Sequence, residues 1–457
     1  MAACLSVPSK SLRLRGLDAL RGFSALFVVL YHAADKTSQA APDNWLYYPV
    51  RAIQFTISHA YITVFLFFVI SGFCIHLQWA RARAAGEEPN VRFGEFWKRR
   101  FRRLYPPYAI VLAFYLLLTA WTVGLDITRF VVYDVVMHLL MLHNLDAHTT
   151  YSINGIFWTL AVEEHLYLAY FLLLFIRQRW GWTVTLAACL LARVGWMVFS
   201  HLVWLKTGFG LPVPESAAVH WYTWALGALA VEAVYGVIKL PRWSADLRIG
   251  ALLIVAASVI STYLPDIPKE SFAHKVGWFL IHPFWGTGFF IVVNRIVQAE
   301  LGWKARAKMP SFISIFAPIG LFSYSIYLTH ELMIMQSWRW SDPARLQMWN
   351  VFLVVIPATL VFAFVYFWFC ERPFMVRRGE SEAAAEPQTA SVLFKLTKEG
   401  SPSRAFYTTV RTRLNAFLRR GSNTADPDAE PATSAVGPTS RLANTYADSI
   451  AVADGQN

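Results

Sequence analysis

The sequence has 457 residues, of which 56% are hydrophobic and only 15% are charged. A soluble domain carries about a quarter charged residues, so this composition excludes an ordinary soluble protein. The net charge of +12 would suit a nucleic-acid-binding protein, but the basic residues lie between apolar stretches, as in the cytoplasmic loops of membrane proteins, and we expect no nucleic-acid partner.

Apolar stretches of about 20 residues recur along the chain, and each is long enough to cross about 30 Å of hydrocarbon. We therefore predict an all-α polytopic membrane protein with about ten transmembrane helices. The first stretch lacks a signal-peptide cleavage site, so we expect it to be retained as a helix. The predicted ranges are 17–35, 60–80, 105–124, 158–176, 181–200, 219–238, 247–263, 275–294, 317–335 and 349–370.

The basic residues predict the orientation of these helices. A dense block of Lys and Arg at 81–103 marks the loop between the second and third helices as cytoplasmic. Residues 130–145 are apolar but short, and they contain Asp134, His138 and His143. An extra span there would reverse the charge bias, so we predict an interfacial or re-entrant helix on the outer side, with both termini cytoplasmic.

Two regions differ in composition. Residues 1–378 form the predicted membrane domain, and residues 379–457 form a polar cytoplasmic tail. Within the tail, residues 404–420 predict a basic amphipathic helix lying on anionic lipid, and the rest is typical of a disordered segment. The four cysteines show neither metal-ligand nor disulfide spacing.

Ionisable residues inside an apolar span are costly, so they are usually functional. The first span holds Arg21 and His32, which lie eleven positions apart and therefore on nearly the same helical face, roughly 16 Å apart along the axis. The structural alternatives are an arginine that extends to the membrane edge and a histidine that bonds a backbone carbonyl.

The fourth span begins with a second polar group. Glu163 and Tyr167 are four residues apart and share a face. Glu163 is a candidate partner for a histidine, because a neighbouring carboxylate fixes the tautomer and stabilises the imidazolium. We expect Glu164 and His165 to lie in water at the interface.

The ninth span carries Tyr324, together with Ser323, Tyr327 and His330 on one stripe. Its predicted direction puts His330 at the depth of His32 and Glu163, which suggests one shared cavity. The alternative is a structural polar network between helices.

Two further features concern the second span and the loop after it. Ser71 and Gly72 form a small-residue notch in a wall of Phe, which permits close helix packing or ligand approach. Arg100 and Arg103 are adjacent on one helical face, and paired guanidiniums suit phosphate. The alternative for the arginine pair is ordinary positive-inside anchoring.

Six segments, in order, resemble the membrane-bound acyltransferase family 3, which O-acetylates bacterial surface polysaccharides. They are LDALRGFSALFVVLYH at 17–32, FFVISGF at 67–73, RRFRRLYPPY at 99–108, FWTLAVEEHLY at 157–167, FSYSIYLTH at 322–330 and ERPF at 371–374. The one departure is Thr159 where the family usually has serine, which keeps a hydroxyl. The resemblance covers residues 12–378 and not the tail.

The resemblance implies an acyl-CoA donor, most simply acetyl-CoA, a glycan or lipid-linked saccharide acceptor, and a bacterial inner membrane location. His32 is then the general base, and Glu163 orients it. The implied contacts with the coenzyme are Arg21, Ser71, Arg100 and Arg103, and those with the sugar are Trp158, Tyr324, Tyr327 and His330. We expect no metal.

Two other classes of function stay open at this point. Membrane-embedded His, Glu and Arg would also suit a proton-coupled transporter or flippase, although no internal repeat is visible and a carrier does not require the arginine pair. A non-catalytic scaffold has no reason to bury several ionisable groups. An acyl-histidine intermediate, the length of the acyl group, the acceptor sugar and the oligomeric state are likewise left open.

Overall fold

A computed structural model describes residues 14–35, 56–89, 91–122, 124, 127–268, 271–302, 310–340 and 351–375. The chain divides into two units, Met1–Ala385 and Glu386–Asn457, and all the described residues belong to the first. The predicted tail at 379–457, including the helix expected at 404–420, therefore lies outside the described residues.

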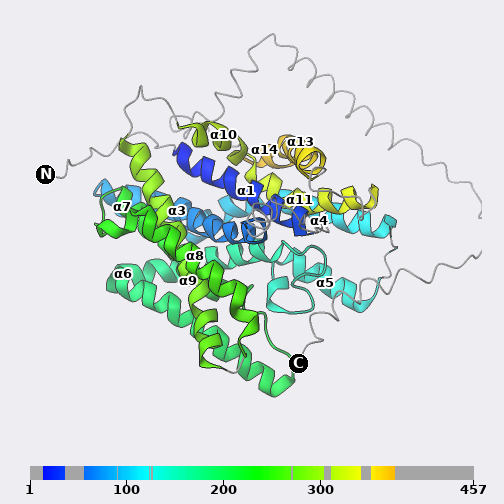
Figure 1. The fold of residues 1–457 in the computed structure, drawn as a ribbon, viewed down its shortest axis with the longest axis horizontal. Coiled ribbons are helices and arrows are strands. Elements are labelled where there is room, and N and C mark those ends of the chain that lie inside the picture. The colour runs from blue at the N-terminus through cyan, green and yellow to red at the C-terminus, as the bar shows by residue number, and fades with distance from the viewer. Residues whose placement is uncertain are drawn as a thin grey trace, which may run out of the picture. The chain divides into compact units, whose positions relative to one another are not determined.

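All regular structure in the described ranges is helical, as the sequence predicted (Figure 1). The α-helices are α1 (Arg15–Asp35), α3 (Thr63–Ala84), α4 (Phe93–Thr122), α5 (Arg129–Leu139), α6 (Trp158–Thr207), α7 (Ala217–Val234), α8 (Leu247–Tyr263), α9 (Phe272–Gly302), α10 (Ser311–Gly320), α11 (Ser323–Trp340), α13 (Ile356–Tyr366) and α14 (Arg372–Met375). Two π-helical turns, Val351–Val355 and Phe367–Glu371, adjoin α13.

The apolar helices identify an all-α membrane protein. Six of the described helices are long and apolar enough to cross a membrane, and the number is seven if α10 and α11, which meet at a bend of 72°, form one broken span. This is fewer than the ten spans predicted. Each of the ten predicted ranges nevertheless overlaps a helix.

Part of the difference in number comes from α6. This helix has 50 residues, which corresponds to about 75 Å and is far more than a membrane requires. Gly181 interrupts it with non-helical backbone angles, φ 80° and ψ −179°. The two arms on either side of Gly181 match the two separate ranges predicted at 158–176 and 181–200.

The segment predicted as an interfacial or re-entrant helix contains α5, which has 11 residues and is therefore about 16 Å long. Thr128 caps its first turn by accepting a hydrogen bond from the backbone N–H of Val131. A helix of this length does not cross the hydrocarbon layer by itself.

Helix α3 packs tightly against α7 at two glycines. A Cβ atom placed on Gly72 would lie 2.0 Å from the backbone oxygen of Trp224, and one placed on Gly227 would lie 1.9 Å from that of Val69. Only glycine allows the two backbones to approach so closely. The notch at Ser71 and Gly72 therefore has two functions: Gly72 packs against the backbone of α7, while Ser71 Oγ accepts from the indole of Trp224 on α7 at 3.3 Å and donates to Glu163 on α6 at 2.6 Å.

The helix that carries Arg21 and His32 lies in the middle of these contacts. Helix α1 packs against α10 and α11 on one side and against α3 on another, and Figure 1 shows α10 and α11 beside it. This packing brings side chains of α10 and α11, late in the membrane region, next to those of α1 at its beginning.

Candidate active site

The last turn of α1 and the middle of α11 meet at a pair of histidines and a carboxylate. Nδ1 of His32 lies 3.5 Å from Oε2 of Glu331, and the ring centroids of His32 and His330 are 5.2 Å apart. His330 is fully buried, whereas His32 keeps 26% of its side chain exposed. The packing of α1 against α11 therefore brings His32 and His330 together, with the exposed part of the group at His32, and their common depth in the membrane stays a prediction.

The hydrogen bonds of His330 define which of its nitrogens carries the hydrogen. Its Nδ1 lies 3.1 Å from the carbonyl oxygen of Ile326 and 2.8 Å from that of Tyr327. A carbonyl oxygen can only accept, so Nδ1 is the donor and Nε2 of the neutral ring has a free lone pair. This buried Nε2 has no hydrogen-bond partner among the described residues.

The carboxylate beside His32 is a correction to the sequence analysis, which expected Glu163. Glu163 instead accepts hydrogen bonds from Ser71 Oγ at 2.6 Å and from Tyr167 OH at 2.5 Å, and it interacts electrostatically with Arg21. Arg21 precedes His32 by eleven residues on α1, roughly 16 Å along the axis. Helical periodicity predicted the face that Glu163 shares with Tyr167, but it does not specify which partner helix supplies the carboxylate to His32.

Glu331, which directly follows His330, was given no role by the sequence analysis. Adjacent residues point about 100° apart on an isolated helix, so only His330 fitted the stripe. In the structure, α11 packs against α1 in such a way that the side chains of both His330 and Glu331 lie beside His32. Glu331 could have been identified from the sequence, because a carboxylate directly beside a candidate histidine is unusual within an apolar span.

A second polar group lies around Arg21. The Nη2 atom of Arg21 lies 3.4 Å from Cys74 Sγ, and Arg103 interacts electrostatically with Arg21, Arg100 and Glu371. Ser325 Oγ donates a hydrogen bond of 2.5 Å to Glu371. Helices α1 and α4 thus place three guanidiniums near one another, and Glu371, from the other end of the membrane region, is a member that the sequence analysis did not find.

The exposure of α4 distinguishes its arginines. Arg100 and Arg103 are half-buried, whereas Arg99 and Arg102 are exposed. Plain positive-inside anchoring requires no such difference, because any arginine facing the aqueous side would serve. The structure thus distinguishes Arg100 and Arg103 from their exposed neighbours, and anion binding by this pair stays a prediction.

Two tyrosines expected to bind the sugar use their hydroxyls in contacts between helices. Tyr324 donates to the carbonyl of Leu104 at 2.8 Å, and the hydroxyls of Tyr327 and Thr159 are 2.5 Å apart. These bonds connect α11 with α4 and α6. They also explain why threonine can replace serine at position 159, since the contact requires only the hydroxyl.

Trp158 lies at the start of α6, where its ring is 5.8 Å from that of His220 on α7 and tilted by 33°. His220 was not among the predicted site residues. Its Nε2 lies 2.7 Å from the carbonyl oxygen of Pro214, which accounts for one of its two nitrogens.

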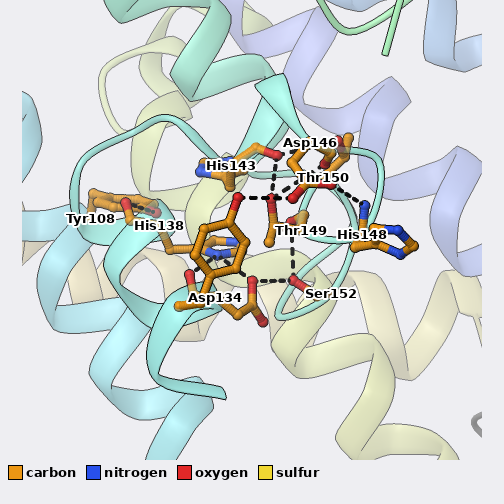
Figure 2. Close-up of polar contacts among 10 residues, drawn as sticks. Tyr108, Asp134, His138, His143, Asp146, His148, Thr149, Thr150 and Ser152 are labelled. Atoms are coloured by element: carbon orange, nitrogen blue, oxygen red, sulfur yellow. Dashed lines mark hydrogen bonds and ion pairs between the residues drawn. The ribbon is translucent and has the colours of Figure 1, made fainter. Parts of the chain in front are cut away.

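The loop that leads from α5 into α6 is held by a separate polar cluster, shown in Figure 2. Asp134 accepts from Ser152 Oγ at 2.7 Å and lies 3.1 Å from Nδ1 of His138. The rings of His138 and His143 stack at 4.1 Å with an interplanar angle of 2°. Burial lowers the pKa of His143 to about 3, so the ring is neutral at physiological pH. The sequence analysis used these polar residues only to argue against a span.

Comparisons with known proteins identify the family of the chain. A family described as an acyltransferase domain matches residues 14–368. The chain is 24% identical to YrhL of Bacillus subtilis, which is provisionally named a peptidoglycan O-acetyltransferase, in an alignment 418 residues long that covers 84% of the chain. It is also 24% identical to the O-acetyltransferase OatA of Staphylococcus aureus, in an alignment 377 residues long that covers 79% of the chain. These alignments cover 59% and 57% of the two relatives, so the chain matches somewhat more than half of their length. No solved structure matches the chain significantly.

Proposed function

Because the chain belongs to the membrane-bound acyltransferase family described by the acyltransferase domain, we propose that it is an O-acetyltransferase that moves an acetyl group from acetyl-CoA to a hydroxyl of a cell-surface or exported glycan. The observation that carries the proposal is the contact between His32 and Glu331 beside His330. The names of the relatives support the reaction, and one of them specifies peptidoglycan, so a peptidoglycan sugar is the first acceptor to test.

His32 acts as the general base. A neutral imidazole nitrogen removes the proton from the acceptor hydroxyl while the oxygen attacks the carbonyl carbon of the thioester. The new C–O bond forms, the C–S bond breaks, and the coenzyme leaves as a thiolate that takes up the proton from His32. Glu331 stabilises the imidazolium in between, because an opposite charge at 3.5 Å favours the protonated ring.

The donor binds at the arginines. Arg100 and Arg103 contact the phosphates of the coenzyme, and Arg21 adds a third positive charge close to them. Glu163, held by Ser71 and Tyr167, balances Arg21 and keeps its guanidinium in place. Arg21 and His32 both belong to α1. The donor therefore lies along this helix, with its phosphates near Arg21 and its thioester carbonyl near His32.

The acceptor binds near the other end of α1. Trp158 offers an aromatic face on which a sugar ring can stack, and the free Nε2 of His330 can accept a hydrogen bond from a sugar hydroxyl. The tyrosines at 324 and 327 support the site by fixing the helices instead of touching the sugar.

The proposal also includes the orientation that the sequence predicted. With both termini in the cytoplasm of a bacterial cell, Arg100 and Arg103 face the compartment that contains acetyl-CoA, whereas His32 lies toward the outer side, where the glycan is found. The two substrates therefore reach the site from opposite sides of the inner membrane.

The proposal is tested with membranes that contain the full chain, labelled acetyl-CoA and peptidoglycan fragments or native envelope glycan. We expect label on the glycan, reduced at least about 100-fold in His32→Ala. His201→Ala, which removes an exposed histidine of α6, is the control and should transfer normally. Normal transfer by His32→Ala would remove His32 from the mechanism. A wild-type chain that labels no glycan but moves protons or solute across the membrane would favour a carrier.

A further inference from the structure

The side chains around His32 have the composition and spacing of a metal site. His32, His330 and Glu331 each offer one ligand atom, and these three atoms all lie within 4.8 Å of one another. Two imidazoles and one carboxylate are a common zinc ligand set, in which the fourth position is taken by water or another ligand. The three residues come from α1 and α11, whose packing brings the ligand atoms together.

The two ring nitrogens of His330 have the environment that is typical of a metal-binding histidine. Metal-binding histidines almost always donate their second ring N–H to a carbonyl or carboxylate, which fixes the tautomer and the orientation of the ring. Nδ1 of His330 does this through two backbone carbonyls of α11, and its buried Nε2 has no hydrogen-bond partner in the described part of the chain. A buried lone pair without a donor is a cost that a bound cation removes.

The stacked pair His138 and His143 does not offer the same arrangement. The lone pairs of an imidazole lie in the plane of its ring, and these two rings are parallel to within 2° at 4.1 Å. Their nitrogens therefore point in parallel planes instead of converging on one ion. The ligand geometry distinguishes the group at His32 from this other histidine cluster.

We propose that His32, His330 and Glu331 bind a divalent transition metal of the zinc type, and that the bound ion inhibits acyl transfer. The inhibition rests on the proposed function, because a metal on His32 occupies the lone pair that would remove the proton from the acceptor. The binding itself does not rest on it, since it requires only the three ligand atoms.

The first measurement uses the purified full chain in lipid nanodiscs, stripped with a chelator and titrated with Zn²⁺. We expect about one ion per chain by elemental analysis, and a visible spectrum of tetrahedral coordination when Co²⁺ replaces it. His330→Ala and Glu331→Gln should each weaken binding by more than the roughly 10- to 100-fold that loss of an outer-shell partner produces. His201→Ala should leave binding unchanged. Equal binding by His330→Ala and the wild type would overturn the site.

The second measurement follows acetyl transfer by the same samples. We expect Zn²⁺ to reduce transfer by the wild type in proportion to occupancy, and a chelator to restore it. Transfer that is unaffected at full occupancy, or that requires the metal, would overturn the inhibition. A chain that binds zinc through these three residues but never acetylates a glycan would keep the metal site and contradict the proposed function, so the two failures are distinguishable.

Discussion

Oε2 of Glu331 lies 3.5 Å from Nδ1 of His32, across the contact between α11 and α1. The two residues are separated by almost the whole membrane part of the sequence, so their meeting is a result of helix packing. The contact places a carboxylate beside the imidazole of His32, where the proposed mechanism requires a group that stabilises the imidazolium. It makes this pair, and not His32 with Glu163, the one whose disruption should alter the chemical step.

Glu331→Gln should lower kcat for acetyl transfer by about 10- to 1000-fold, because the amide keeps the size of the side chain but does not stabilise the imidazolium. The KM for acetyl-CoA should change little. Steady-state kinetics with labelled donor measure both values. Glu163→Gln is the matched comparison, and a loss of kcat confined to that variant would restore the pairing that the sequence first suggested.

Arg100→Ala and Arg103→Ala should each raise the KM for acetyl-CoA about 10- to 100-fold, which corresponds to the roughly 1.5–3 kcal/mol of a hydrogen bond to a charged group. Transfer from a short acetyl thioester without phosphates should be unaffected. Arg99→Ala and Arg102→Ala are suitable controls, since both side chains are exposed on the other face of α4. A rise in KM for the glycan alone would contradict the assignment to the donor.

Gly72→Ala should destabilise the protein by about 1–3 kcal/mol, because the added methyl group would overlap the backbone of α7 at 2.0 Å. Thermal unfolding in detergent measures the loss as a lower midpoint. Gly195→Ala provides the control: its Cβ would meet no atom within 4 Å and should raise helix stability slightly. Equal midpoints for Gly72→Ala and the wild type would mean that α3 and α7 are not in close contact.

The loop between α5 and α6 should lose stability in acid. The pKa of His143 is lowered to about 3 by burial, whereas the unfolded chain has a pKa near 6.5. The folded state therefore binds fewer protons, so the contribution of this group is complete above pH 6.5 and decreases as the pH falls toward 3. At pH 5 the loss is about 2 kcal/mol.

Hydrogen exchange of residues 143–157 between pH 7 and pH 5 checks this dependence, after correction for the intrinsic effect of pH on exchange. His143→Phe keeps a flat ring against His138 but does not titrate, so its opening free energy should vary less with pH. Parallel pH dependences for the variant and the wild type would show that another group is responsible.

The sequence by itself was sufficient for properties that depend on composition and on the geometry of one helix. The apolar stretches identified a helical membrane protein, because an unpaired backbone is too costly in lipid for other structures. The 3.6-residue period predicted the shared face of Glu163 and Tyr167, whose hydrogen bond is 2.5 Å. The apolar stretches separated residues 158–176 from 181–200, and the break in α6 lies at Gly181, the first residue of the second range.

Only the tertiary structure decided which of these faces meet. The sequence contains Glu163, Glu331 and Glu371 as similar carboxylates in apolar surroundings, and periodicity cannot assign them to Arg21, His32 or Arg103. That assignment depends on how far each helix is shifted and rotated against its neighbours, which is determined by contacts such as those of Gly72 with α7 and of α1 with α10 and α11. A single helical turn of displacement moves a side chain by about 5.4 Å, enough to exchange one partner for another.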